Sequence, residues 1–519
     1  MLKSHIRTSA VFTSLLLLSA CGVNPVTHKT ELQLVSQSEE ISIGQQNYAP
    51  ARQQQGGDYI VDPELTAYVQ SVGKKLAAAS DRQLPYEFVV LNDSVPNAWA
   101  MPGGKIAFNR GLLYELNSEA ELAAVLGHEI VHAAARHGAQ SMETGMLLQG
   151  AMAAAGMATQ DSKYAELIVG GAQLSTKLIS TKFGRDDESE ADLYGMRYMK
   201  KAGYDPRAAV TLQETFVRLS QDHKSSFIDG LFASHPPSEE RVAANKATLA
   251  ELGEEGLWGR EIYAQKLGKL KASQPAYQAH DAGVQALAKG DVQQAGLLAK
   301  RAAEAEPREA RFQELLGDVA LKQDKNQEAL GFYQRAIELN PDYFRPYAQT
   351  GMVLSKLGRQ AEAEPYLKRG VDLLPTADSF YLLGRIAEDK GDVNTALQNY
   401  QTAAGSNSEV GKAAIGRYAR LDLPRNPGKY LQASLQPDNM GYLSVVVRNP
   451  TRTPVTKVLV RLVRFDAETK QPNAQTQLLI DARIDPGQSG QMKVEGVQIY
   501  KQTELKLYRV MVEGAQLAK

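Results

Sequence analysis

Three kinds of hydrophobic pattern follow one another along the chain. Residues 61–265 combine helix-like runs of alanine and leucine with short extended runs, which predicts an α+β domain. Residues 275–421 carry helical patterns throughout, and residues 430–519 alternate apolar with polar positions as β-strands do. We therefore expect a multidomain, mainly α protein with an α+β domain, an α-helical array and a C-terminal β-sandwich.

Turn and capping residues mark the first elements of the α+β segment. A helix is predicted over residues 63–80, which open with a proline suited to the first helical position. A strand follows at residues 86–91, and Pro102-Gly103-Gly104 separates two short extended runs, as in a hairpin. Two later apolar runs, at residues 146–157 and 167–179, are too short to span a bilayer and are expected to be core or lid helices.

The helical array repeats with a period of 33 or 34 residues. Glycine, alanine, proline and tyrosine recur at equivalent positions, a pattern typical of tetratricopeptide repeats, in which small residues lie where paired helices cross closely. Such arrays present a concave surface to peptides or partner proteins. A helical spacer without a binding role is the alternative. The residues in register are Gly283, Gly317, Gly351 and Gly384; Ala295, Ala329, Ala363 and Ala396; Pro307, Pro341 and Pro375; and Tyr333, Tyr366 and Tyr400.

The first 20 residues predict a targeting segment, the signal peptide of a lipoprotein. Two basic residues precede a short apolar run over residues 11–20, and Cys21 follows it. This ending resembles a bacterial lipobox, so we expect Cys21 to be lipidated and to anchor the protein to the outer membrane, on the periplasmic side. An ordinary secretory signal followed by a free cysteine is the alternative. Residues 21–60 are polar and are expected to form a tether with one short helix.

Composition narrows the choice of partners. The 519 residues include 58 basic and 59 acidic ones, for a net charge of −1, and no basic patch stands out. We therefore expect no nucleic-acid partner. Cys21 is the only cysteine, so no disulfide can form within the chain.

A second helix is predicted over residues 118–137. Ser118 and Glu121 form a capping box at its start, alanine and leucine dominate it, and Gly138 is expected to end it. This helix contains the run His128-Glu129-Ile130-Val131-His132. Side chains four residues apart share one face of a helix, so the two histidines of the run are expected to lie together.

The histidine run is the main candidate for chemistry. His128 and His132 lie one turn apart, which suits two nitrogen ligands on one zinc ion. Glu129 points away from their face and is placed to accept a proton from a water beside the metal, as in a metalloprotease. A chance match in an alanine-rich helix is the alternative.

A second motif offers the missing ligand. Residues 185–203 predict a helix with an acidic start, on which Glu188 and Asp192 share a face. Glycine at position 138 excludes the longer arrangement with a third histidine, so Glu188 is the best candidate for the third ligand. Asp192 is expected to accept a hydrogen bond from the far nitrogen of a liganding histidine, whereas Glu190 is expected to be a solvated charge. Acidic helix starts are common, so this motif alone is weak evidence.

Together the two motifs resemble the metallopeptidase family of the CAAX prenyl endopeptidases and HtpX. The similarity covers about residues 31–250. No segment after the leader reaches 18 consecutive apolar residues, so the chain is similar to the secreted, lipid-anchored, BepA-like branch rather than to the membrane-embedded ones. The resemblance implies a zincin-like fold of the gluzincin type with one zinc ion per chain, the ligands His128, His132 and Glu188, the base Glu129 and the outer hydrogen-bond partner Asp192.

The segment Ser234-His235-Pro236-Pro237 also matches this family. Two prolines restrict its backbone and can aim His235 at the metal. There His235 would act in catalysis by stabilising the oxyanion of the reaction intermediate, or it would bind zinc in place of water and hold the enzyme shut. We favour the second role; a surface histidine in a turn is the alternative.

Asn97, Ala98 and Trp99 lie in the first strand of the predicted hairpin, just before the zinc helix. An edge strand beside a metal can bind substrate as an added strand, through main-chain hydrogen bonds. A purely structural hairpin is the alternative, at about even weight.

We expect a lipid-anchored periplasmic zinc endopeptidase that degrades misfolded outer-membrane proteins or assists their assembly. The resemblance implies unfolded or misassembled envelope proteins as clients and the outer-membrane barrel assembly machinery as a partner of the repeat array. Contact with the membrane is expected through the lipid anchor only. The alternative is a repeat-based chaperone or scaffold for envelope assembly whose zinc site is latent or structural. The β-sandwich departs from the plan of the BepA-like branch, and no motif assigns it a role.

Overall fold

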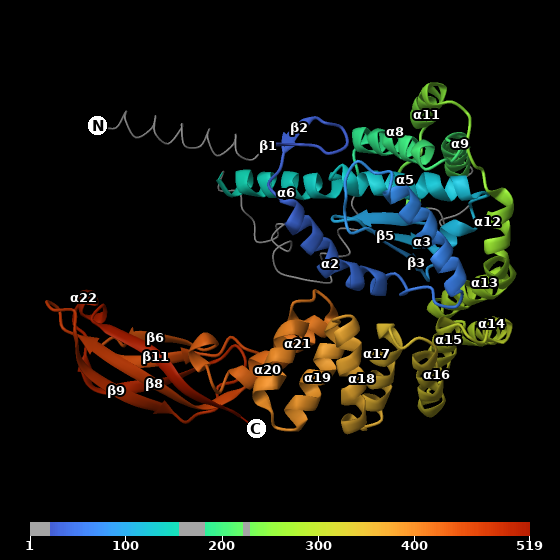
Figure 1. Cartoon of the computed structure of the whole chain (residues 1–519). Coiled ribbons are helices and arrows are strands. Elements are labelled where there is room, and N and C mark those ends of the chain that lie inside the picture. The colour runs from blue at the N-terminus through green and yellow to red at the C-terminus, as the bar shows by residue number, and fades with distance from the viewer. Residues whose placement is uncertain (1–20, 155–181, 222–228, 519) are drawn as a thin grey trace, which may run out of the picture. The chain divides into compact units, whose positions relative to one another are not determined.

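The chain folds into two compact units, Met1–Val353 with Asp372–Leu374 and Leu354–Val371 with Pro375–Lys519. Figure 1 presents the computed structural model of the protein. The first unit contains the α+β domain and the first repeats, and the second contains the later repeats and the C-terminal strands.

The structure describes residues 21–154, 182–221 and 229–518. The leader and the second predicted apolar helix, at residues 1–20 and 167–179, lie outside these ranges. Among the helices that the structure describes, none is both long and apolar enough to cross a membrane.

A three-stranded sheet lies at the centre of the α+β domain. It consists of β3 (Glu87–Leu91), β4 (Ala98–Met101) and β5 (Lys105–Asn109), in the order β3-β5-β4. β5 runs parallel to β3 and antiparallel to β4, so the predicted strand and hairpin are confirmed. Gly103 in the hairpin turn has a φ of 79°, and a Cβ atom there would lie 2.6 Å from the Cα of Ile41, so the turn requires glycine.

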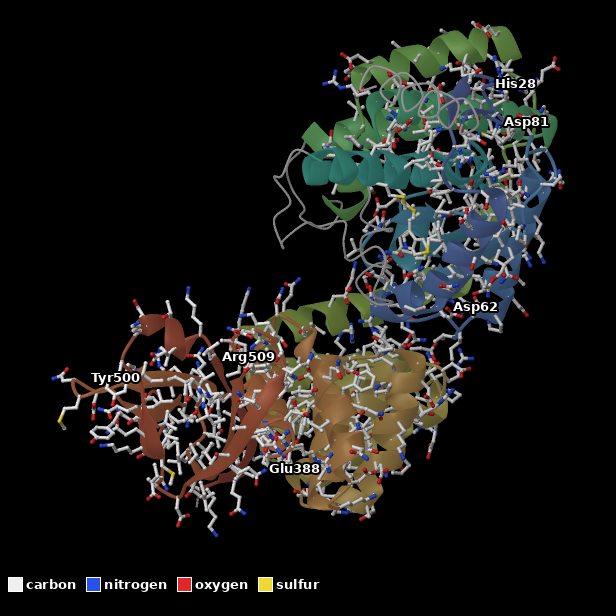
Figure 2. The ribbon with its side chains drawn as sticks, turned by 90° about the vertical axis from the view of Figure 1, so that its left-hand side faces the viewer. His28, Asp62, Asp81, Glu388, Tyr500 and Arg509 are labelled. Carbon is white, nitrogen blue, oxygen red and sulfur yellow. The ribbon has the colours of Figure 1, made fainter. Side chains whose placement is uncertain are left out.

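Helices pack against this sheet and against one another. The predicted helix after Asp62 is α3 (Pro63–Ala77), and Asp62, which Figure 2 labels, is its N-cap. The Asp62 carboxylate accepts a hydrogen bond from the Leu65 amide. α5 (Glu119–Ala134) lies between α3 and α8 (Arg185–Lys201), and almost all of its residues are buried. Further helices of the domain are α4 (Arg110–Leu113), α9 (Arg207–Gln221), α10 (Asp229–Ser234), α11 (Glu239–Leu252) and α12 (Arg260–Lys266).

The zinc helix ends earlier than predicted. α5 ends at Ala134, and α6 (His137–Ala154) starts before Gly138, which therefore lies inside a helix. Arg136 forms the turn between the two helices with a φ of 65°, a backbone conformation that is unusual for any residue except glycine. The guanidinium of Arg136 is held by several partners, which stabilises this conformation and replaces the expected glycine stop.

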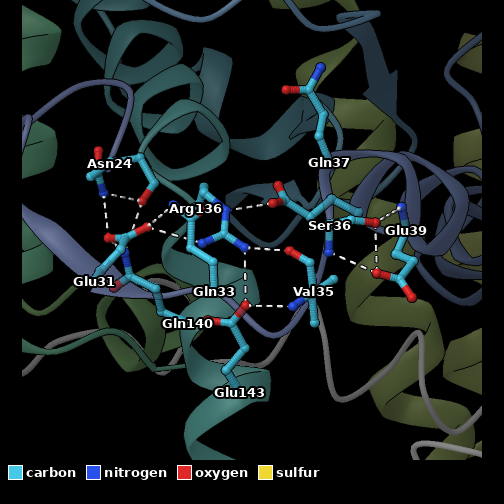
Figure 3. Close-up of polar contacts among 12 residues, drawn as sticks. Asn24, Glu31, Gln33, Val35, Ser36, Gln37, Glu39, Arg136, Gln140 and Glu143 are labelled. Atoms are coloured by element: carbon cyan, nitrogen blue, oxygen red, sulfur yellow. Dashed lines mark hydrogen bonds and ion pairs between the residues drawn. The ribbon is translucent and has the colours of Figure 1, made fainter. Parts of the chain in front are cut away.

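Residues 21–60 are not the tether expected from their polar composition. They form β1 (Cys21–Val23), β2 (Thr30–Leu32) and the 18-residue helix α2 (Gln37–Gln54), and α2 packs on the α+β domain. The reason is a buried network around Arg136, which no local pattern reveals (Figure 3). Its partners are the carboxylates of Glu31 at 3.0 Å, Glu40 at 2.6 Å and Glu143 at 3.0 Å, and the carbonyl oxygen of Val35 at 2.7 Å.

The predicted repeats form paired helices in both units. Glycine lies where these helices cross, as their spacing predicts: a Cβ at Gly317 would lie 2.5 Å from the Tyr333 ring, and one at Gly384 would lie 2.7 Å from the Tyr400 ring. The helices are α13 (Gly268–Ala288), α14 (Val292–Ala305), α15 (Ala310–Lys322), α16 (Asn326–Leu339), α17 (Phe344–Lys356), α18 (Gln360–Leu373), α19 (Ala377–Asp389), α20 (Val393–Ala404) and α21 (Glu409–Asp422).

The C-terminal residues form two three-stranded antiparallel sheets, ordered β10-β7-β6 and β11-β8-β9. Valines of both sheets belong to one buried cluster, among them Val445 and Val460. The strands are β6 (Gln432–Pro437), β7 (Tyr442–Arg448), β8 (Val455–Phe465), β9 (Pro472–Ile480), β10 (Ser489–Gln498) and β11 (Tyr508–Leu517), with the short helices η2 (Pro427–Lys429) and α22 (Gln502–Leu505).

Candidate metal centre

Close packing of α5 against α8 brings the two predicted motifs together. Gly195 on α8 faces Gly127 and His128 on α5, and a Cβ at Gly195 would lie 3.1 Å from the His128 backbone nitrogen. A larger residue at either glycine would push the helices apart. The acidic residues at the start of α8 therefore reach the histidines of α5.

Four side chains converge at one point. One ligand atom from each of His128, His132, Glu188 and His235 lies within 4.8 Å of the other three, and all four residues offer nitrogen or carboxylate oxygen. His128 Nε2 lies 3.0 Å from His132 Nε2 and 3.5 Å from Glu188 Oε2. His235 Nδ1 lies 3.3 Å from His128 Nε2 and 2.9 Å from Glu188 Oε1.

These separations fit zinc. Ligand atoms at zinc distances in a tetrahedral site are spaced about 3.3 Å apart, close to the spacing of these four atoms. The donor set, three imidazoles and one carboxylate, is also typical of zinc. The structure therefore brings together the three predicted ligands and places His235 Nδ1 beside them, where it could serve as a fourth ligand.

Glu129 lies beside this cluster, buried to 1% exposure. Its Oε1 is 3.5 Å from His235 Nε2, and its Oε2 has no hydrogen-bond partner among the described residues. Burial raises the pKa of Glu129 above its ordinary value. A buried carboxylate with a free oxygen and a raised pKa suits a general base that must hold a proton during the reaction.

Asp192 and Arg241 support His128 from outside the cluster. His128 Nδ1 lies 2.9 Å from Asp192 Oδ1, so the proton on Nδ1 is donated to the carboxylate and Nε2 is free for a metal. Arg241 donates two hydrogen bonds of 2.8 Å to the same carboxylate. Burial alone would raise the pKa of Asp192, but the charges and hydrogen bonds of Arg241 and His128 together outweigh it, and the pKa is lowered.

Arg241 makes more contacts around the site than its place in the sequence suggested. Its Nη1 lies 2.8 Å from Glu188 Oε2 and donates to the Pro236 carbonyl oxygen at 3.1 Å. Arg241 thus ties the loop that carries His235 to two acidic residues of α8. Arg241 follows Pro237 by four residues, but its contacts depend on the packing of α11 against α8 and could not be predicted from the sequence.

The proposed substrate strand lies at the end of the central sheet. β4 pairs with β5, and no other strand that the structure describes pairs with β4; its Ala98 and Trp99 are buried. Trp99 packs edge-on against Tyr48 and donates a hydrogen bond from its indole to Gln55 Oε1. The carbonyl oxygen of Asn97 accepts from the Asn109 amide at 2.8 Å, so part of this strand serves the hairpin itself.

A hollow opens from the cluster between α5, α8, α9 and α11. Apolar side chains form most of its wall, with His128, Glu129 and His235 at one end. Gln213 also lines it, and the amide nitrogen of this buried side chain has no hydrogen-bond partner among the described residues. The apolar lining consists of Ala124, Val125, Ala191, Met196, Met199, Ala209, Leu212 and Phe216.

Comparisons with known proteins agree with this geometry. Residues 63–249 match the family model of peptidase family M48, and residues 280–344 and 332–364 match tetratricopeptide repeat models. The beta-barrel assembly-enhancing protease of Escherichia coli is 27% identical over 395 residues, which are 66% of this chain and 79% of that protein. The mitochondrial metalloendopeptidase OMA1 of Schizosaccharomyces pombe is 32% identical over 234 residues, 44% of this chain and 66% of that protein.

Coverage differs between relatives. A Vibrio cholerae relative is 32% identical over 203 residues, so the match spans 36% of this chain and 40% of that protein. Among solved structures, MamA from Desulfovibrio magneticus RS-1 gives a TM-score of 0.27 at 19% identity and covers 30% of this chain and 88% of that chain. The family match and the converging donors meet in the same segment: residues 63–249 form a peptidase family M48 domain, that of a zinc-dependent metalloprotease, and tetratricopeptide repeats follow it.

Proposed function

We propose that this chain is a lipid-anchored zinc endopeptidase of the bacterial periplasm that degrades outer-membrane proteins when their assembly stalls, or assists that assembly. One observation carries the proposal: four metal-binding side chains lie within 4.8 Å of one another, beside a buried carboxylate with an unpartnered oxygen. A structural zinc site has no use for such a base, whereas hydrolysis requires one.

In this proposal His128, His132 and Glu188 hold the zinc ion. Bound zinc supplies a Lewis acid that polarises the peptide carbonyl and makes a water more acidic. Glu129 accepts the proton of the attacking water and later donates it to the leaving amine. Asp192 keeps the His128 proton on Nδ1, so that Nε2 faces the metal throughout.

His235 is proposed to keep the enzyme latent. Its Nδ1 lies among the donor atoms, so it would compete for the position that water takes on a catalytic zinc ion. A histidine there competes with water and must leave before cleavage. This role suits an enzyme that shares its compartment with many unfolded clients.

Substrate binding is proposed to use the edge of β4 at Asn97, Ala98 and Trp99, where an extended peptide adds to the sheet. Because the Trp99 side chain already contacts Tyr48 and Gln55, the backbone of β4 is the part that substrate would contact. The hollow lined by Met196 and Phe216 would then take an apolar side chain of the client.

The setting and the clients are proposed from other features. Lipidation of Cys21 would anchor the protein to the outer membrane, and the repeats would recruit unfolded envelope proteins or the barrel assembly machinery. The name of the Escherichia coli relative, a beta-barrel assembly-enhancing protease, supports this client class. The repeat array is proposed to span residues 275–421.

The finer architecture also belongs to the proposal. A zincin-like metallopeptidase domain would occupy residues 61–265, and a β-sandwich residues 430–519. Mixed pairing in the sheet of β3, β5 and β4 next to α5 supports the first assignment. The second is supported by the buried cluster that both C-terminal sheets share. The alternative function, a chaperone or scaffold with a latent site, is favoured only by His235 at the fourth donor position.

Glu129→Gln tests the proposal. The amide cannot accept the proton of water, so cleavage of an unfolded outer-membrane protein should fall by about 10²- to 10⁴-fold. Zinc content, measured by metal analysis, should stay at one per chain. Glu214→Gln, on the exposed side of α9, is the control and should cleave normally. Normal cleavage by Glu129→Gln would contradict the proposal, and an inactive wild-type chain that still assists assembly would favour the scaffold.

A further inference from the structure

His137 lies against a zinc ligand although it follows that ligand by five positions in the sequence. The left-handed turn at Arg136 reverses the chain and starts α6 at His137. As a result, His137 Nδ1 lies 2.8 Å from His132 Nδ1, and both rings are buried. A continuous α-helix would have carried His137 away from that nitrogen, because residues five apart do not share a helix face.

A contact between two imidazole nitrogens fixes where the protons lie. His132 Nε2 faces the donor cluster, 3.0 Å from His128 Nε2 and 3.5 Å from Glu188 Oε1. When Nε2 binds zinc, the ring proton of His132 must be on Nδ1. His137 Nδ1 must then accept that proton in a hydrogen bond, which places the His137 proton on Nε2.

The surroundings of His137 Nε2 suit a proton on that nitrogen. Its Nε2 has no hydrogen-bond partner among the described residues, but Glu190 Oε2 lies 3.6 Å away and Asp187 Oδ1 4.0 Å away. Glu190 is not the solvated charge expected from its place on α8. Its other oxygen lies 2.6 Å from Lys29 Nζ, which holds the carboxylate toward the histidine.

An aromatic ring stacked on the His132 imidazole limits tilting of the imidazole plane. Phe183 lies parallel to the imidazole, with ring centroids 4.0 Å apart and an interplanar angle of 19°. Stacking fixes the plane of the ring but does not distinguish Nδ1 from Nε2. The contact with His137 supplies that distinction.

We propose that His137 is a positioning residue, which accepts the Nδ1 proton of His132 and so directs Nε2 to the zinc, with Glu190 and Lys29 orienting His137 in turn. Each histidine of α5 then has its own outer partner: Asp192 for His128 and His137 for His132. The inference rests on the zinc role proposed for His132.

Zinc affinity of the full chain, measured by competition with a chromophoric chelator, tests the proposal. His137→Leu removes the acceptor at similar size and should weaken zinc binding by about 10- to 100-fold. His137→Asn places Oδ1 where histidine has Nδ1, so it should bind zinc within about threefold of wild type. His280→Leu is the matched control: His280 is a buried histidine paired with Asp281 in the repeats, and its loss should leave zinc affinity unchanged.

The outcomes distinguish a failure of the positioning role of His137 from a failure of the proposed function. Wild-type affinity in His137→Leu, or equal losses in His137→Leu and His137→Asn, would overturn the positioning role and leave the zinc site intact. A wild-type chain without zinc affinity would overturn the proposed function itself. Glu190→Ala keeps the test decisive if His137→Leu fails to fold, because Glu190 is partly exposed; it should weaken zinc binding by about threefold or more, and unchanged binding would refute the proposal.

Discussion

Arg241 is the residue on which the arrangement of the metal site depends most widely. One guanidinium contacts the Asp192 carboxylate, the Glu188 carboxylate and the carbonyl oxygen of Pro236. The planar group offers five donors in a fixed geometry, which a lysine could not reproduce. A single buried side chain therefore sets the distance between the acidic motif of α8 and the loop that carries His235.

His235→Ala should raise basal cleavage and self-cleavage several-fold, because the alanine leaves the fourth donor position to water. The three remaining ligands should keep zinc bound at one per chain. Proteolysis of an unfolded client and of the chain itself, followed on gels, checks the rate, and metal analysis checks the zinc. A fall in rate would instead assign His235 to oxyanion stabilisation.

The convergence of His128, His132 and Glu188 could be predicted better than the contacts around them. The two histidines lie four apart and so share a helix face, and Glu188 was the best candidate for a third ligand in the absence of a third histidine. His137 and Glu190 could not be predicted, because their contacts depend on the backbone turn at Arg136 and on Lys29, which is 161 positions from Glu190. Long-range partners of this kind leave no periodic trace in the sequence.

At the scale of elements, the crossing of α5 and α8 determines whether the site can form. A Cβ added at Gly195 would lie 3.1–3.4 Å from backbone atoms of Gly127 and His128, a tight contact. A glycine in a helix interior costs about 1 kcal/mol relative to alanine, so this one is explained by the close approach that it permits. The crossing places Glu188 and Asp192 opposite the histidines.

Gly195→Val should push α5 and α8 apart. The added methyl groups would meet the α5 backbone, which cannot move as a flexible side chain would, so the first unit should lose about 1–3 kcal/mol of stability. Zinc affinity should fall as well. Gly331→Val is the matched control, because a Cβ at this helical glycine of α16 meets no atom within 4 Å. Calorimetric midpoints with and without a chelator check both effects, and equal midpoints for the two variants would contradict the crossing argument.

The helices with apolar faces could be predicted from the sequence, whereas the extent of the polar helix α2 could not. α3 and α5 follow from capping residues and apolar spacing, and the repeat helices follow from their period. α2 was expected only as a short helix in a tether, because its mean composition is polar. Its attachment depends on the Glu40 carboxylate paired with Arg136 and Arg82, two arginines far along the chain.

At the scale of the whole molecule, the first repeat helices are built into the peptidase unit. Asn92, just after β3, donates to both carboxylate oxygens of Glu309 at 3.0 Å, and the Tyr277 hydroxyl donates to the same carboxylate at 2.6 Å. Glu309 is 1% exposed. Within this unit, the peptidase domain and the first repeat helices therefore share a buried polar junction rather than a flexible linker.

Glu309→Ala should lower the stability of the first unit by about 2–4 kcal/mol, because Asn92 and Tyr277 would be buried without their acceptor. Thermal unfolding followed by circular dichroism checks this. Glu304→Ala, exposed at the end of α14, should change stability by less than about 0.5 kcal/mol. Similar midpoints for the two variants would argue against a structural junction.

The fold of residues 21–54 also limits how far an anchored enzyme could reach. A disordered segment of about 40 residues would let a domain wander roughly 35 Å from its anchor. Here β1 begins at Cys21, and ion pairs with Arg136 hold Glu31 and Glu40. A lipid on Cys21 would therefore be joined to the folded domain by almost no flexible chain. An enzyme anchored in this way would stay next to the bilayer. Proximity to the membrane would then restrict which clients the enzyme meets, whatever their sequence.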